Sequence, residues 1–347
     1  MGDTHMAAGT VHCFTSASLA YADRALVLGH SLRRQHPDWV IWLCLVDRPP
    51  EGFALDALTA AFDHIVPAEA LPIASVRGWL FGHDVVEACT AVKGAMLGHM
   101  LDQGADRVLY LDPDIAVFAP LTALADQLDT ADVLLTPHVL VPEPTAAGVL
   151  DNEIGALKHG IYNLGFVGVS GRGEGRRFAR WWDERLQAHC IDDIPAGLFT
   201  DQRWCDHVPV FFPGTQIVRD PGCNVASWNL ANRPLSIGTD GVIRAAGVPL
   251  RFFHFTKFTG IGRLMLERQG GTASALAEVM AWYAHALAAQ APAGLPAGWW
   301  AYGHYADGRP IPREHRRRWR ADDALRARIP DPFALTFREA AELTRSA

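Results

Sequence analysis

Two aspartates stand one residue apart in the sequence Asp112-Pro113-Asp114, directly after the apolar residues 107–111 and before the apolar residues 115–118. In an extended segment, side chains two positions apart point the same way, so both carboxylates would face one side of the chain. Such a pair suits a hard divalent cation, which completes its shell with phosphate oxygens. Short Asp-x-Asp sequences are also common in turns, but carboxylates beside a buried strand are costly unless they hold a ligand.

A histidine lies within a second apolar and aromatic segment, residues 250–256. A single histidine in such surroundings is more often a satisfied core residue than a ligand. Together with the acidic pair, however, His254 is a candidate third metal ligand, because neutral imidazole suits Mn²⁺ as well as oxygen donors do. Lys257 follows closely, and its ammonium group could neutralise a diphosphate. The pattern therefore predicts a site for a metal-bound anion.

These candidate ligands are expected at one edge of a sheet. Three segments are apolar at nearly every position, which is typical of strands buried on both faces: residues 10–15, 39–46 and 107–111. Residues 21–35 predict a helix between the first two strands. Apolar residues recur every three or four positions over residues 84–104, where Asp84 and Glu87 resemble a capping box, and predict a second helix. This is the start of a βαβ fold, in which ligands bind where the strands end.

The alternation continues through predicted strands at residues 132–135 and 161–169 and a predicted helix at residues 175–189. Beyond residue 270 the character changes to an Ala-rich helix, a Pro/Gly linker and an aromatic, arginine-rich tail. We expect three parts: a tag or disordered start at residues 1–9, an α/β catalytic domain at residues 10–270, and a helical C-terminal extension at residues 271–347.

The composition is that of an ordinary globular protein, with 347 residues, 49% hydrophobic and 20% charged residues, and a formal net charge of −7. It excludes intrinsic disorder and fibrous repeats. The acidic balance argues against nucleic acid as the main partner, because binding to a phosphate backbone needs clustered positive charge. The six cysteines show no C-x-x-C spacing, and no segment reaches the roughly 20 apolar residues of a membrane helix. We therefore expect a cytoplasmic protein.

Several short elements follow one another along the chain: Phe14-Thr15, Tyr21, a helix bearing Lys93, Val108-Leu-Tyr-Leu-Asp-Pro-Asp-Ile115, Tyr162-Asn-Leu-Gly-Phe166, Thr200-Asp-Gln202 and Phe253-His-Phe255. In this order they resemble the GT-A-fold glycosyltransferases of family 8, the group of glycogenin and the lipopolysaccharide galactosyltransferases. The resemblance covers about three quarters of the chain and rests on order as well as spelling. It implies a Rossmann-like mixed sheet flanked by helices.

The resemblance also implies roles for individual residues. The metal ligands would be Asp112, Asp114 and His254. Thr15 and Tyr21 would lie near the nucleotide base, although Tyr21 has a simpler alternative, in which it only packs.

Four further residues are implied in binding the donor. Lys93 would reach the donor, and Asn163, Asp201 and Gln202 would contact its sugar, with Asp201 or Gln202 positioning or electrostatically supporting the sugar during the reaction. The simpler alternatives are a solvated helix position for Lys93 and a turn for Asn163.

The implied activity is transfer of a sugar from a nucleoside-diphosphate sugar, most often a UDP-sugar, with Mn²⁺ or Mg²⁺ as cofactor and with retention of the anomeric configuration. The acceptor stays open among a glycan, a lipid-linked molecule and a protein. Two other functions stay open as well. One is a nucleotidyltransferase, which shares a similar core, and the other is a catalytically inert module that binds a nucleotide or a sugar.

The arginine-rich residues 313–320 form the remaining feature. Basic runs are usually solvated helix faces. The functional alternative is contact with the acceptor or with the inner face of a membrane, because arginine and aromatic side chains bind sugars and phosphates. The expected location is then cytoplasmic, with peripheral attachment to that membrane.

Overall fold

A seven-stranded mixed sheet lies at the centre of the computed structural model, which describes residues 9–258, 260 and 274–345. Its strands follow the order β10 (Thr215–Ile217), β6 (Val133–Pro137), β7 (Tyr162–Ser170), β4 (Arg107–Leu111), β1 (Val11–Ala17), β2 (Val40–Leu45) and β3 (His64–Pro67). Strand β7 runs antiparallel to both of its neighbours, β4 and β6, while the other adjacent strands are parallel. The mixed α/β sheet predicted from the sequence is confirmed.

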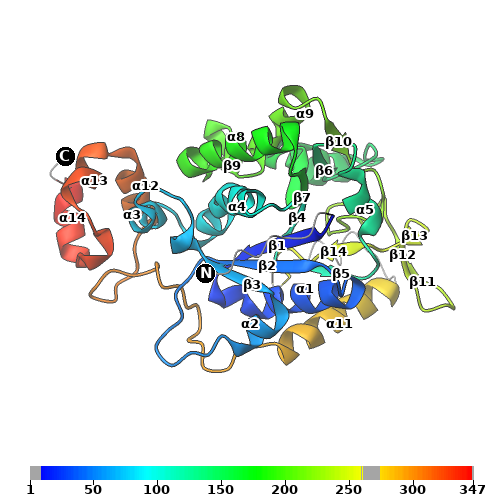
Figure 1. Cartoon of the computed structure of the whole chain (residues 1–347), viewed down its shortest axis with the longest axis horizontal. Coiled ribbons are helices and arrows are strands. Elements are labelled where there is room, and N and C mark those ends of the chain that lie inside the picture. Colours follow the sequence, from blue (N-terminus) through cyan, green and yellow to red (C-terminus); the bar gives the residue numbers. More distant parts are fainter. Residues whose placement is uncertain (1–8, 259, 261–273, 346–347) are drawn as a thin grey trace.

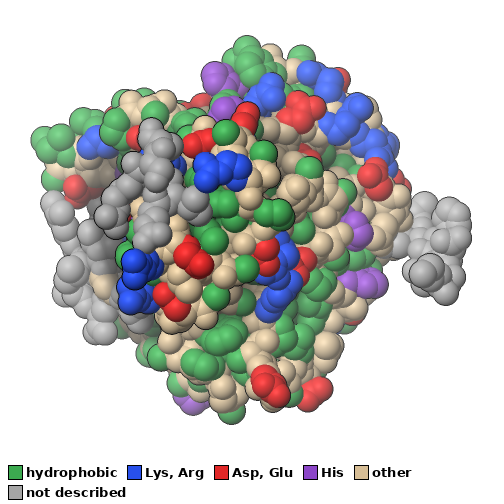
Figure 2. Space-filling view, turned by 90° about the vertical axis from the view of Figure 1, so that its left-hand side faces the viewer, with side chains coloured by type: hydrophobic (Ala, Val, Ile, Leu, Met, Phe, Trp, Pro, Cys, Tyr) green, Lys and Arg blue, Asp and Glu red, His purple; other side chains and the backbone are tan. Residues whose placement is uncertain are grey.

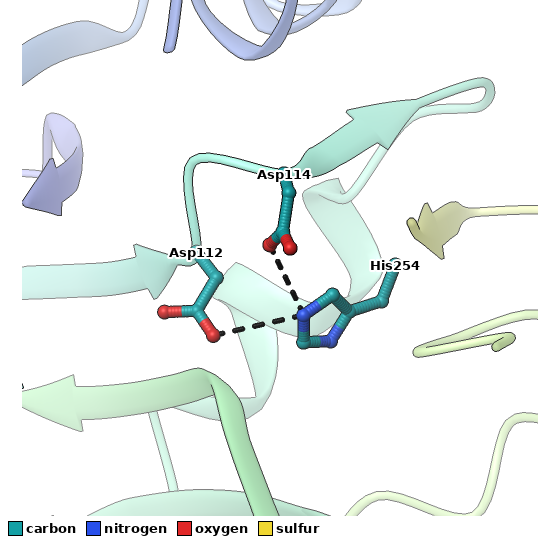
Figure 3. Close-up of side chains that lie close together, drawn as sticks. All are labelled: Asp112, Asp114 and His254. Atoms are coloured by element: carbon teal, nitrogen blue, oxygen red, sulfur yellow. Dashed lines mark ion pairs between the residues drawn. The ribbon is translucent and has the colours of Figure 1, made fainter. Parts of the chain in front are cut away.

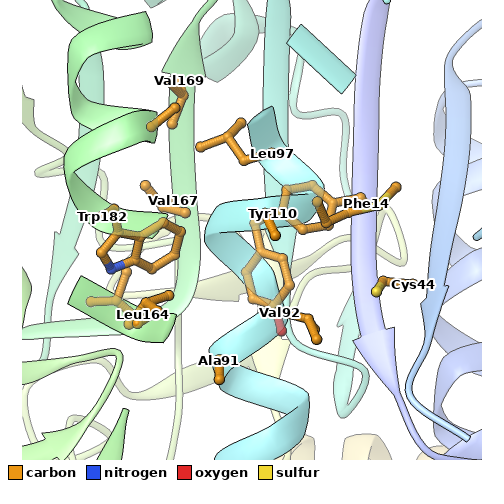
Figure 4. Close-up of a cluster of buried hydrophobic side chains, with 14 of the residues drawn as sticks. Phe14, Cys44, Ala91, Val92, Leu97, Tyr110, Leu164, Val167, Val169 and Trp182 are labelled. Atoms are coloured by element: carbon orange, nitrogen blue, oxygen red, sulfur yellow. The ribbon is translucent and has the colours of Figure 1, made fainter. Parts of the chain in front are cut away.

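Helices cover both faces of this sheet, as Figure 1 shows. One face carries α4 (Val85–Asp102) and α8 (Gly173–His189), and the other carries α1 (Ala22–Gln35), α2 (Asp56–Ala61) and α5 (Thr122–Gln127). Because both faces are covered, every residue of β1, β6 and β7 is buried. Figure 4 shows the apolar cluster between the sheet and the first pair of helices, with Trp182 of α8 on one side and Tyr110 of β4 near its middle.

Shorter elements connect these layers: α3 (Val76–Phe81), β5 (Ile115–Val117), α6 (Ala146–Gly148), α7 (Ile154–His159), β8 (Ile191–Asp193), β9 (Leu198–Thr200) and α9 (Val208–Phe211). A small sheet of β11 (Leu235–Ile237), β12 (Ile243–Ala245) and β13 (Val248–Pro249) follows, and then β14 (Phe252–His254), which pairs antiparallel with β5. The last elements are helices: α11 (Ser274–Ala289), α12 (Arg313–Ala321), α13 (Asp323–Arg328) and α14 (Phe337–Arg345).

Helix α4 is more deeply buried than an amphipathic surface helix, because it lies between the sheet and α8. Its predicted capping box is confirmed, since the Asp84 carboxylate accepts from the Glu87 backbone N–H and the Glu87 carboxylate accepts from the Asp84 backbone N–H. Gly94 allows the close crossing with α8, where a Cβ at this position would lie 2.4 Å from the Cα of Asp183. The close packing buries Lys93, the residue before this glycine, inside the protein.

Helices α12, α13 and α14 pack together with α3 at one end of the molecule (Figure 1). Helix α11 lies elsewhere, beside α1, where Tyr283 stacks on Phe255 with ring centroids 3.6 Å apart. The division of the chain at residue 270 stays a prediction, and the predicted start at residues 1–9 lies, apart from Gly9, outside the described residues.

Only part of α12 is a solvated face. Arg313 and Arg317 are exposed, as the simpler expectation has it, but this does not hold for the whole segment. Arg316 is 3% exposed and donates to the backbone carbonyls of Phe81, His83 and Tyr302. The other arginines also contact the chain: Arg313 lies near Asp84, Glu87 and Asp192, Arg317 donates to the Asp192 carbonyl, Arg318 pairs with Asp322, and Arg320 pairs with Glu87. These contacts attach the helix to α3, α4 and β8.

The surface at this end of the molecule agrees with that account. Figure 2 shows its Lys and Arg side chains in several separate groups with acidic side chains beside them, and not in one continuous basic patch. Among the described residues, no helix is both long and apolar enough to cross a bilayer. Peripheral membrane contact through α12 stays a prediction.

Candidate metal centre and its cavity

The two aspartates lie in a tight turn between β4 and β5, and not in the extended segment expected from the sequence. The backbone N–H of Ile115 donates to the Asp112 carbonyl at 3.1 Å, which closes a four-residue turn with Pro113 in its second position. Proline favours this position because its ring fixes φ near the value that the turn needs. The carboxylates converge through this turn instead of through strand alternation.

His254 completes the set predicted from the sequence. It is the last residue of β14 and pairs with Ile115 of β5, which brings its ring over the turn. Its Nε2 lies 3.1 Å from a carboxylate oxygen of Asp114 and 3.7 Å from one of Asp112 (Figure 3). One ligand atom from each of the three residues lies within 4.8 Å of the others. Two carboxylates and an imidazole at this spacing form a donor set that fits a divalent cation.

The charges of this set act on one another. Burial alone would lower the pKa of His254, but the carboxylates of Asp114 and Asp112 outweigh it and raise that pKa above its ordinary value. Burial opposes ionisation of Asp114, but the neighbouring imidazole outweighs it and lowers the pKa of this carboxyl. The site therefore holds concentrated negative charge that a cation would neutralise.

Two residues of β7 hold the imidazole in place. The Nδ1 atom of His254 lies 3.2 Å from Oδ1 of Asn163 and donates to it, which leaves Nε2 directed at the aspartates. A Cβ at position 165 would lie 2.5 Å from the imidazole Cε1, so Gly165 is the residue that lets the ring lie against the strand. Asn163 lies within a strand and orients the ring, so its alternative as a turn residue is wrong.

Asp112 is fixed by hydrogen bonds on its other oxygen. The Tyr110 hydroxyl donates to Oδ1 at 2.6 Å, and the Lys93 ammonium donates to the same oxygen at 3.2 Å. This leaves Oδ2 facing His254. The sequence interpretation missed Tyr110, although it lies two positions before Asp112, so strand alternation places both on one side.

Lys93 joins two carboxylates beneath the site. It is 1% exposed and donates to Asp201 at 2.8 Å, to the Leu164 carbonyl at 3.1 Å and to Asp112. Burial alone would lower its pKa, but the two carboxylates outweigh it and raise the pKa, which keeps the ammonium charged. The alternative of a solvated helix residue is wrong. Its predicted contact with the donor stays a prediction, because its three N–H groups already have partners.

Asp201 and Gln202 are also buried and held. Asp201 accepts from Lys93 and from the Thr200 hydroxyl. Gln202 accepts from the Leu164 N–H at 3.1 Å and from the Asn163 amide at 3.2 Å, and it donates to the His159 carbonyl. Their predicted contacts with the donor sugar stay predictions.

The residues predicted to lie near a nucleotide base are separate from this cluster. Thr15 is buried in β1, and its hydroxyl has no hydrogen-bond partner in the described part of the chain. Tyr21 is 43% exposed, with the Arg24 guanidinium 4.3 Å above its ring. Neither residue belongs to the lining of the cavity described next, and their role stays a prediction.

A cavity of about 600 Å³ opens over the metal centre. Its lining brings together eight of the ten residues predicted from the sequence: Lys93, Asp112, Asp114, Asn163, Asp201, Gln202, His254 and Lys257. Lys257 is exposed at the end of the segment that follows His254. The lining also includes residues that the sequence analysis did not single out, among them Asn152, Ser227 and Trp228. Ser227 and Trp228 come from an irregular segment, and Asn152 lies in a short π-helical turn, Val149–Glu153, so no sequence signal pointed to them.

No family model matches the chain. The uncharacterized protein YfnD of Bacillus subtilis (strain 168) is 24% identical to it over 257 residues, which is 72% of this chain and 78% of that protein.

Solved structures similar to the chain include three glycosyltransferases. The galactosyltransferase LgtC, in complex with donor and acceptor sugar analogues, has a TM-score of 0.48 at 17% identity and covers 84% of this chain and 99% of its own. The glycosyltransferase GlyE of Streptococcus pneumoniae TIGR4 has a TM-score of 0.44 at 16% identity, and the match covers 80% of this chain and 64% of the GlyE chain. Mouse xyloside xylosyltransferase 1 has a TM-score of 0.43 at 14% identity, and the match covers 73% of this chain and 99% of the mouse chain.

Proposed function

We propose that this chain is a metal-dependent glycosyltransferase that moves a sugar from a nucleoside-diphosphate sugar, with UDP as the nucleotide, to a hydroxyl acceptor. The observation that carries the proposal is the convergence of Asp112, Asp114 and His254 at the wall of a polar cavity of about 600 Å³. An oxygen-rich donor set with open positions suits Mn²⁺ or Mg²⁺ bound to a diphosphate.

The chemistry follows from charge. When the sugar leaves its nucleotide, negative charge develops on the departing phosphate, and a bound divalent cation stabilises it as a Lewis acid. Asp112, Asp114 and His254 hold the cation, and the exposed Lys257 ammonium adds positive charge at the cavity. Asp201 and Gln202, fixed by their hydrogen bonds, position the donor sugar.

The proposal includes retention of the anomeric configuration. The bond from the anomeric carbon to the phosphate oxygen breaks, the acceptor oxygen bonds to the same face of that carbon, and the acceptor proton passes to the leaving phosphate. No protein base is needed for this transfer. The proposal leaves out membrane contact through α12, because the arginines of that helix are occupied within the chain.

Metal-dependent donor binding is the test. Thermal melting of the protein with UDP, GDP, CDP or dTDP, each with and without Mn²⁺, should show a selective rise with UDP that needs the metal. Release of UDP from UDP-sugars should be lost in Asp114→Ala and kept in the matched control Asp102→Ala, whose carboxylate is exposed at the end of α4.

Four outcomes would contradict the proposal or part of it. Absence of any metal-dependent shift removes the donor site, and UDP release that survives in Asp114→Ala removes the metal centre from the reaction. An inverted product, identified by NMR of the first-formed anomer, would overturn retention alone. Binding without turnover would favour the inert module over an enzyme.

A further inference from the structure

Three residues of the cavity lining, here called the wall, each carry a polar atom that has no hydrogen-bond partner within the described chain: Oδ1 of Asn152, Oγ of Ser227 and Nε1 of Trp228. Asn152 is 3% exposed and Ser227 is 2% exposed. Buried polar groups in native proteins are nearly always paired, and leaving one unpaired costs about 1–3 kcal/mol. Three such atoms on the wall therefore point to partners that a ligand supplies.

Aromatic rings belong to the same cavity lining. The ring of Trp228 meets His138 with centroids 5.2 Å apart and meets His254 with centroids 5.4 Å apart, in both cases edge to face. His159 and Phe199 form a second edge-to-face pair at 4.7 Å. All of these rings line the cavity, and all except the buried His254 are partly exposed. The Trp228 contact with His254 places the wall next to the metal centre.

The chemistry of this wall matches a neutral sugar. A hydroxyl, an amide oxygen and an indole N–H can pair with sugar hydroxyls, and partly exposed aromatic rings can cover the apolar face of a pyranose. Asn152, Ser227 and Trp228 carry no charge, so they match a neutral ligand better than an anion. A lipid tail has no polar group that could pair with the three atoms.

We infer that Asn152, Ser227 and Trp228 form the acceptor subsite and that the acceptor is a neutral saccharide. This inference rests on the proposed function. Under that proposal the donor sugar has its own partners in Asn163, Asp201 and Gln202, so the three unpaired atoms are left for the second substrate. Pairing with the acceptor hydroxyls would hold its sugar ring beside His254, close to the donor diphosphate.

Two variants isolate single atoms of this wall. Ser227→Ala removes the hydroxyl, and Trp228→Phe removes the indole N–H but keeps an aromatic ring against His254. With the UDP-sugar that the protein hydrolyses, methyl β-glucopyranoside, methyl β-galactopyranoside and lactose are offered as acceptors beside 1-octanol and a serine peptide. We expect at least one saccharide to accept sugar and the non-sugar alcohols to fail. Each variant should raise the KM for that saccharide three- to tenfold, the value of one hydrogen bond.

The matched controls are Ser236→Ala and Trp282→Phe, which change partly or fully exposed residues outside the cavity and should leave the saccharide KM unchanged. Quenching of tryptophan fluorescence by the saccharide, in the presence of UDP and Mn²⁺, gives a readout without turnover and should weaken in Trp228→Phe. Melting curves show whether a variant is folded. The Mn²⁺ midpoint, which is the Mn²⁺ concentration that gives half of the full rise in melting temperature, shows whether its metal centre is intact.

The outcomes separate this inference from the proposed function. If the donor is bound and hydrolysed with Mn²⁺ but octanol or the peptide is the acceptor, the saccharide assignment is overturned. If a saccharide is the acceptor but both folded variants keep the wild-type KM, the subsite is overturned. If no nucleotide binds with metal, the proposed function fails, and the inference fails with it.

Discussion

At the scale of single residues, the metal centre is shaped by the side chains behind its ligands. Asn163 occupies Nδ1 of His254, and Tyr110 with Lys93 occupies one oxygen of Asp112. His254 and Asp112 therefore each present one remaining atom toward the same point. Such supporting hydrogen bonds fix ligand orientation and commonly change metal affinity by 10- to 100-fold when they are removed.

Tyr110→Phe tests this support, because it removes the 2.6 Å hydrogen bond to Asp112, together with a longer hydrogen bond, of 3.2 Å, to the Ser16 hydroxyl. Without it the Asp112 carboxylate can rotate, and we expect the Mn²⁺ midpoint to rise by about tenfold or more. The fold should survive, because the phenyl ring still packs in the core beside Phe14. Titration of Mn²⁺ against the melting temperature measures the effect.

The matched control is Tyr283→Phe, which removes the hydroxyl of another buried tyrosine, one that has no hydrogen-bond partner among the residues that the structure describes. It should leave the Mn²⁺ midpoint unchanged. Equal midpoints in wild type and Tyr110→Phe would show that the tyrosine packs but does not orient the metal ligand.

Some of these residues could be predicted from the sequence and others could not. The aspartates were found through a short motif and Lys93 through the family resemblance, and Tyr110 was within reach through strand alternation. The need for glycine at position 165 depends on the His254 ring, which lies 89 positions later in the chain and meets β7 only in the folded state. Ser227 and Trp228 belong to an irregular segment whose path is set by tertiary packing.

At the scale of elements, the central strands and helices were predictable because burial on both faces leaves a continuous apolar run in the sequence. β1, β2, β4, α1 and α4 lie within a few residues of their predicted bounds. The pairing of β14 with β5 was not predictable, because it joins two three-residue strands from distant parts of the chain. That pairing is the contact that carries His254 to the acidic turn.

Helix α12 shows how charge patterning can mislead. Its sequence is typical of a basic surface. Arg316, however, is buried and donates to three backbone carbonyls that lie outside regular helix or strand hydrogen bonding among the described residues. The long side chain packs near the rings of Trp300 and Phe81. The sequence cannot distinguish such an arginine from a solvated neighbour.

Arg316→Met should therefore detach α12, because methionine keeps much of the apolar stem but leaves the carbonyls of Phe81, His83 and Tyr302 unpaired. We expect a loss of about 3 kcal/mol in the free energy of unfolding. Hydrogen exchange over residues 299–345 should rise together with this loss, and urea unfolding gives its size.

Arg317→Met is the control on the same helix. Arg317 is exposed and donates to the Asp192 carbonyl at 3.3 Å, so its loss should cost less than about 0.5 kcal/mol. If both variants unfold at the same urea concentration, the buried hydrogen bonds of Arg316 do not hold the helix.

At the scale of the whole molecule, the C-terminal segments are part of the structure that supports the cavity. Trp299, Trp300 and Ala301 bond to residues 46–48 at the end of β2, and α12 contacts the start of α4. Helix α4 in turn carries Lys93 to the carboxylates of the site. Loss of packing at this end should therefore shift α4 and disturb the metal centre.

Buried histidines make this assembly sensitive to acid. His83, 1% exposed between α3 and α12, has its pKa lowered to about 3 by burial and by the nearby Arg320 guanidinium. Below pH 6.5 the unfolded chain binds a proton at this imidazole and the folded chain does not, so stability falls as the pH falls. The loss is about 1.4 kcal/mol per pH unit, or roughly 2 kcal/mol by pH 5.

Other titratable groups also determine how the free energy of unfolding changes with pH. His12 and His138 have pKa values lowered to about 4, mainly by burial, and act in the same direction as His83. Asp47 acts in the opposite direction, because burial raises its pKa to about 6, so the folded chain takes up a proton between about pH 6 and pH 4 and gains stability there. The lowered pKa values of these three histidines are the larger shifts, so we expect a net loss of stability between pH 7 and pH 5.

His83→Asn separates the contribution of His83 from this sum. Asparagine can keep the donor that contacts the Trp79 carbonyl at 2.7 Å, but it does not titrate. Urea unfolding at pH 7.5, 6 and 5 should show a decline about 2 kcal/mol smaller than in wild type by pH 5. His30→Asn changes an exposed histidine on α1 and should keep the wild-type slope. Equal slopes for wild type and His83→Asn would mean that His83 is protonated in the folded protein, with its charge accommodated between α3 and α12.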